Sequence, residues 1–83
     1  MKGMDKMKLY TCSMYDCYIG ESFLLGIFST RDGAEHQAHV WLSGLGMGFE
    51  LIDYDNEYNF YRAENGRHYT AHFEEFTLNE LSF

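Results

Sequence analysis

The sequence contains no proline, no internal repeat and no low-complexity stretch. It also has no apolar run of about 18 residues, the length that a membrane-spanning helix needs. No signal peptide is visible, because residues 1–8 are polar and lysine-rich and no apolar segment follows them. We therefore expect a cytoplasmic protein that does not enter a membrane, with Cys12 and Cys17 as reduced thiols.

Basic residues are scarce, and their distribution is uneven. The chain has 6 Lys and Arg against 13 Asp and Glu, a net charge of −7. Residues 1–48 hold five acids and four bases, whereas residues 49–83 hold eight acids and two bases. This acidity argues against direct binding of the second half to nucleic acid or to an anionic membrane, and it favours a basic partner.

The apolar content is high for so short a chain. A chain of 83 residues buries only about 60–65% of its unfolded surface, so its core must be dense. Aromatic residues make up 18% of the sequence, and each can bury a large area. We predict one domain over residues 8–83, preceded by a disordered segment, residues 1–7.

Two apolar patterns in the first third predict strands. Residues 8–14 alternate between two faces, as expected of a half-buried strand. Residues 23–28 form a continuous apolar run, which predicts a buried central strand. Residues 15–22 read as a loop, and we expect the two strands to pair antiparallel around it.

A helix is predicted after residue 28. Ser29 to Asp32 fits the capping box, with Ser29 as the N-cap. The apolar residues that follow share one helical face, and glycines 44, 46 and 48 end the helix. That face consists of Ala34, Ala38, Trp41, Leu42 and Leu45.

The remainder predicts three more strands. They cover residues 49–52, 58–63 and 68–75, with residues 53–57 as a turn or extended edge and a bulge at Glu74 and Glu75. Asn65-Gly66 is a strong hairpin signal between the last two strands. The predicted class is α+β, an antiparallel sheet with one helix packed on one face, in the order β-β-α-β-β-β.

One segment carries a resemblance. Residues 25–35, LGIFSTRDGAE, resemble a pattern in small bacterial and phage domains of unknown function. In these domains a strand ending in G-[IV]-[FY]-S-[ST] leads into a helix carrying Ala-Glu, and the chain closes with an acidic strand like residues 74–78 here. The resemblance implies the same fold and a phage or bacterial origin, and it carries over no catalytic residue.

Cysteine and histidine spacings do not predict a metal site or an enzyme. Cys12 and Cys17 are separated from His68 and His72 by 50 residues, far more than zinc motifs allow. Two strand residues four apart also span about 13 Å. His36 and His39 share a helix face but lack a third ligand nearby in sequence. We expect surface histidines, a Cys12 packed as a small hydrophobe, and no cofactor.

The acidic stretch is the remaining candidate site. If residues 53–57 were extended, Asp53, Asp55 and Glu57 would project about 6.6 Å apart, close to the spacing of phosphates along a nucleic-acid strand. Glu74 and Glu75 extend the row. Exposed tyrosines would add contact area, and the set predicted for this role is Tyr54, Tyr58 and Tyr61.

The sequence therefore predicts a small acidic, non-enzymatic, phage-encoded protein. It would bind and inhibit a basic or DNA-binding host protein by mimicking phosphates. A passive acidic face that keeps the protein soluble is one alternative. A structural or regulatory homodimer through Trp41, Leu45 and Phe83 is another, and a metal- or small-molecule-binding module is a third.

Overall fold

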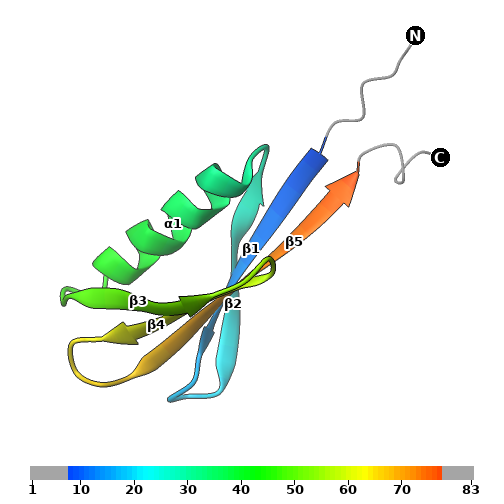
Figure 1. The fold of residues 1–83 in the computed structure, drawn as a ribbon. Coiled ribbons are helices and arrows are strands. Elements are labelled where there is room, and N and C mark those ends of the chain that lie inside the picture. Colours follow the sequence, from blue (N-terminus) through cyan, green and yellow to red (C-terminus); the bar gives the residue numbers. More distant parts are fainter. Residues whose placement is uncertain (1–7, 78–83) are drawn as a thin grey trace, which may run out of the picture.

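The structure is a computed structural model that describes residues 8–77. It confirms the α+β class, with five strands and one helix in the predicted order (Figure 1). The predicted disordered segment, residues 1–7, lies outside the described residues. The elements are β1 (Lys8–Asp16), β2 (Glu21–Phe28), α1 (Arg31–Ser43), β3 (Phe49–Tyr54), β4 (Tyr58–Ala63) and β5 (His68–Thr77).

The five strands form one antiparallel sheet in the spatial order β2-β1-β5-β4-β3. Its centre is the pair of β1 and β5, which match without interruption from Lys8 opposite Thr77 to Asp16 opposite Tyr69. The helix α1 covers one face of the sheet and leaves the other face open (Figure 1). We call the uncovered side the open face.

The core lies between α1 and the sheet. Period-2 alternation points Cys12 and Met14 of β1 toward the helix, and Tyr69, Ala71 and Phe73 of β5 point the same way. The helical face is confirmed from Ala34 to Leu42, since Ala34, Ala38 and Leu42 are fully buried and Trp41 is partly buried against the same core. Leu45 packs against that core too, but its place on the helix was wrong, because α1 ends at Ser43 with Gly44 as its C-cap.

The helix begins one residue later than the capping box predicts. Thr30 has extended backbone angles, φ −136° and ψ 155°, and its hydroxyl accepts a hydrogen bond from the Gly33 amide at 2.9 Å. Thr30 is therefore the N-cap, and the assignment of Ser29 was wrong. Both residues carry a hydroxyl, so the backbone conformation decides between them.

The prediction that residues 23–28 form a central strand was wrong, because β2 is an edge strand. Among the described residues its only neighbour is β1, whose other side pairs with β5. As a result, Leu24 and Ile27 remain 68% and 64% exposed. A continuous apolar run indicates that a strand has two apolar faces, but it does not show how many neighbours the strand has.

The predicted bulge at Glu74 and Glu75 was also wrong. The pairing of β5 with β1 is regular there, so Glu74 and Glu75 project from opposite faces. The pairing register instead shifts in the two edge strands, each of which has one extra residue that is not paired with its neighbour. These residues are Leu25 in β2 and Ile52 in β3. Bulges are common at sheet edges, where only one partner strand constrains the register.

The two hairpin connections follow local turn chemistry. Asn65-Gly66 joins β4 to β5 as predicted, with Gly66 at φ +89° and the Ala63 amide donating to the Arg67 carbonyl at 2.8 Å. The connection from β1 to β2 is shorter than the predicted loop, because the strands continue to Asp16 and resume at Glu21.

Candidate functional site

The segment that joins β3 to β4 is a tight turn, not an extended row. The Asp55 carboxylate accepts hydrogen bonds from the amides of Glu57 and Tyr58, both at 2.8 Å. The Asp55 amide donates to the Tyr58 carbonyl at 2.8 Å and closes the turn. Residues 53–57 were predicted as a turn or an extended edge, and the structure has the turn. The phosphate-like spacing expected of Asp53, Asp55 and Glu57 in an extended segment therefore does not form, because Asx turns compete with extended backbone.

This turn lies against the second half of β5. The Phe73 amide donates to the Glu57 carbonyl at 2.7 Å, and the Arg31 guanidinium donates to the Asn56 carbonyl at 2.7 Å. A hollow of about 580 Å³ opens beside these contacts. We call it the acidic hollow. Its lining includes three of the predicted carboxylates, Glu57, Glu74 and Glu75.

Aromatic side chains form much of the remaining wall of the acidic hollow. Tyr10, Phe73 and Phe76 line it together with His72. Rings beside carboxylates suit a cationic side chain, since both the ring faces and the oxygens attract positive charge. The sequence did not identify the rings of β1 as site residues, because Tyr10 joins Phe73 only through the β1–β5 pairing.

Among the described residues, Arg31 is the one arginine or lysine in the lining of the acidic hollow, and its charge already has partners. Its guanidinium lies 3.3 Å from the Asn59 oxygen, 3.8 Å from the Glu35 carboxylate and 4.0 Å from the centre of the Phe73 ring. Arg31 therefore holds the helix start, the turn and β5 together, and it offsets little of the charge of the carboxylates around the hollow.

The three carboxylates differ in their partners. Glu75 forms an exposed ion pair with Lys8 at 3.0 Å, and the hydrogen bond and the charge of Glu75 raise the pKa of Lys8. Within residues 8–77, Glu57 and Glu74 form no ion pair. Two negative charges at the hollow are thus available to an incoming cation.

The three predicted tyrosine anchors lie in different environments. Tyr54 is 69% exposed, and Tyr58 is half-buried on the open face, where its ring stacks on His72 at 4.7 Å. Tyr61 is fully buried beneath α1, so its assignment as an exposed anchor was wrong. Tyr58 and Tyr61 differ by an odd number of positions on one strand and therefore face opposite sides of the sheet.

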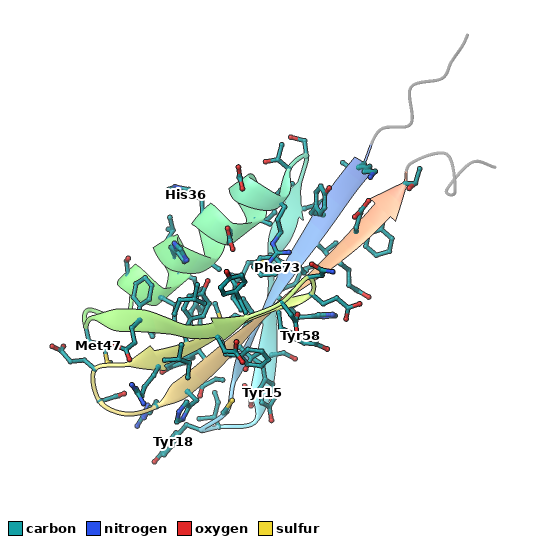
Figure 2. All side chains as sticks on the ribbon, in the orientation of Figure 1. Tyr15, Tyr18, His36, Met47, Tyr58 and Phe73 are labelled. Carbon is teal, nitrogen blue, oxygen red and sulfur yellow. The ribbon has the colours of Figure 1, made fainter. Side chains whose placement is uncertain are left out.

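A second hollow, of about 390 Å³, lies on the open face and was not predicted. Small residues at the centre of the sheet, Ser13 and Thr70, leave space between the larger Tyr15 and Tyr58. Figure 2 shows Tyr15 and Tyr58 on the side of the sheet away from α1, whereas Phe73 lies between the sheet and the helix. No Asp, Glu, Lys or Arg side chain lines this hollow within the described chain.

The cysteines lie on opposite sides of the sheet and are both free thiols. Cys12 is buried under α1, and this burial raises its pKa to about 11, whereas Cys17 is exposed. Among residues 8–77, no three His, Cys, Asp or Glu side chains are grouped to hold a metal ion. His36, His39 and His68 are exposed and His72 is half-buried, as predicted.

The helix surface predicted for a homodimer is largely occupied. The Trp41 ring contacts Phe23 and Tyr69, with centroids 5.9 and 5.8 Å apart, and Leu45 packs against the core. Phe83, the third residue of that prediction, lies outside the described residues. The most exposed aliphatic side chains of the described residues, Leu24 and Ile27, lie instead on β2.

The chain matches no protein-family model, no curated protein and no solved structure. The resemblance of residues 25–35 to small phage and bacterial domains therefore stays a prediction. In the part of the chain that the structure describes, no helix has the length and apolar character needed to cross a bilayer.

Proposed function

We propose that this protein is a non-enzymatic interaction protein whose acidic hollow binds a basic surface of a partner protein. The observation that carries the proposal is that Glu57, Glu74 and Glu75, from two separate elements, line one aromatic-walled hollow. An arginine or lysine side chain of the partner would enter the hollow, against the rings and beside the carboxylates.

Charge over the whole molecule supports the same partner chemistry. A net charge of −7 on 83 residues attracts basic surfaces over a distance and speeds their encounter. DNA-binding proteins present such surfaces, so occupation of one would inhibit its binding to nucleic acid. In this proposal a cluster of carboxylates mimics the phosphates of nucleic acid. The turn at Asp55 prevents Asp53, Asp55 and Glu57 from forming a regularly spaced row.

The proposal includes a phage origin and a host cytoplasm, where the free Cys12 and Cys17 would remain reduced. It assigns no catalytic residue and no cofactor. Asp55 shares the turn with Glu57 and adds to the local field, while its carboxylate also holds the turn. Tyr54, the most exposed of the predicted anchors, would contribute contact area beside the turn.

Binding to an arginine-rich peptide of defined sequence tests the proposal. Glu57→Gln with Glu74→Gln removes the two unpaired charges without changing side-chain size. The dissociation constant, measured by fluorescence anisotropy, should rise about two- to thirty-fold, the range for two exposed ion pairs. Added salt should weaken the wild-type complex.

The matched control is Glu21→Gln with Glu64→Gln, which removes the same number of charges outside the lining of the acidic hollow. This control should bind almost as well as wild type. Equal losses in both double variants would show that net charge alone attracts the peptide, and the acidic hollow would then lose its proposed role.

A further inference from the structure

The edge strand β2 has little of the charge that usually protects an exposed edge, although it carries a bulge at Leu25. Within residues 8–77 it has one neighbour in the sheet, and only Glu21 among its eight residues is charged. Leu24 and Ile27 lie opposite Ser13 and Thr11 of β1, so both project from the open face, where they are 68% and 64% exposed. An edge of this kind presents unpaired backbone groups together with apolar side chains.

The opposite edge, β3, is protected. It carries two charged residues, Glu50 and Asp53, among its six positions, and the extra residue Ile52 interrupts its ladder. Charges and bulges are the devices by which natural sheets prevent pairing between edges. Both edges carry a bulge, so the two charges of β3 distinguish it from β2. The extra residue Leu25 in β2 also turns both Leu24 and Ile27 toward the open face.

We propose that β2 pairs antiparallel with β2 of a second copy of this chain, so that two sheets join into one of ten strands. A two-fold axis perpendicular to the sheet would place both helices on one side and both open faces on the other. Leu24 and Ile27 would then pack beside the same residues of the second copy. Phe23, which is 37% exposed and stacks on Trp41, would add apolar contact on the helix side.

The charge pattern favours a second copy as the occupant. Glu21 is the first residue of β2 and its single charge. When two copies of β2 pair antiparallel, the two Glu21 carboxylates therefore lie toward opposite ends of the shared ladder and do not face each other. Because β3 carries two charges, pairing through β2 uses the less protected of the two edges that residues 8–77 form in each copy, and the assembly closes at two chains.

The proposed dimer is independent of the binding of a basic partner. No residue of β2 lines the acidic hollow, so both hollows of a dimer stay accessible. The two interactions should also respond to salt in opposite ways. Each copy carries a net charge of −7, so screening should strengthen the apolar β2 interface, whereas it weakens binding of a cationic peptide.

Sedimentation velocity over a range of concentrations tests the dimer. The test variant is Leu24→Lys with Ile27→Lys, which places on β2 the residue that natural edges use for protection. The matched control is Leu51→Lys with Ile52→Lys on β3, whose side chains are 44% and 42% exposed. Far-UV circular dichroism verifies that both variants keep the fold.

We expect the wild-type chain and the β3 control to sediment as dimers, with a dimer dissociation constant that falls as salt is added. The β2 variant should sediment as a monomer, with a dimer dissociation constant at least tenfold higher. A wild-type chain that stays monomeric up to about 1 mM would overturn the proposal. So would a β2 variant that dimerises as well as wild type, or assembly beyond two chains.

Discussion

Replacing Asn59 by leucine should destabilise the fold more than any other change of similar size at a polar residue. Asn59 is fully buried, and its side chain makes three hydrogen bonds. Its oxygen accepts from Arg31 at 3.3 Å, and its amide nitrogen donates to Glu35 and to the Tyr61 hydroxyl, each at 2.8 Å. These bonds connect β4 to α1, and Asn59→Leu removes all of them while keeping the number and branching of the side-chain heavy atoms.

The expected loss follows from the partners of these bonds. A hydrogen bond to a charged group contributes about 1.5–3 kcal/mol and a neutral one about 1 kcal/mol. Arg31 and Glu35 keep side-chain exposures of 28% and 35%, so water compensates part of their loss and the lower values apply. Tyr61 keeps His39 as a partner at 3.0 Å. Burial of the apolar leucine side chain is itself favourable and offsets a further part of the lost hydrogen-bond energy. The expected net loss in the free energy of unfolding is about 3 kcal/mol.

Urea unfolding followed by circular dichroism measures this loss directly. A domain of this size has a total stability of about 4–12 kcal/mol, so the midpoint should fall substantially while the slope stays constant. The control is Asn56→Ala, which leaves the backbone contact of Asn56 with Arg31 in place and should change stability by less than about 0.5 kcal/mol. A loss below about 1 kcal/mol for Asn59→Leu would refute the importance of the network.

Two further predictions concern the helix cap and the buried thiol. Thr30→Ala should lower the free energy of unfolding by about 1 kcal/mol, and Ser29→Ala should leave it nearly unchanged, as chemical denaturation can measure. Burial raises the pKa of Cys12 to about 11 from 9.0, so the unfolded thiol ionises first and stability should fall as pH rises through that interval. In Cys12→Ala, the contribution of the thiol to the loss of stability at high pH should be absent. In the native wild-type protein, an alkylating reagent should modify Cys17 alone.

Local signals in the sequence predicted the elements well. The helical face from Ala34 to Leu42 was identified because residues at helical spacing face the same side whatever they pack against. The strand Tyr58–Ala63 and the hairpin at Asn65-Gly66 follow from alternation and from a turn that needs positive φ. In each case the deciding interactions lie within a few residues.

The candidate site was predicted only in part. Glu57, Glu74 and Glu75 meet at the acidic hollow, but the aromatic wall supplied by Tyr10 could not be predicted, since it depends on which strands pair. Tyr61 was misplaced for a related reason. An aromatic residue on a strand suits a buried and an exposed position equally well until the side covered by the helix is known.

The sequence by itself determined the α+β class, the order of the elements and the charge of −7, because periodicity, turn chemistry and composition are properties of the chain. Only the tertiary structure decided that β1 and β5 are central and that β2 is an edge. Strand order depends on pairings between residues about sixty positions apart, such as Tyr10 with Glu75, and such pairings leave no local pattern. Those pairings place the acidic hollow beside β5 and leave Leu24 and Ile27 exposed on β2.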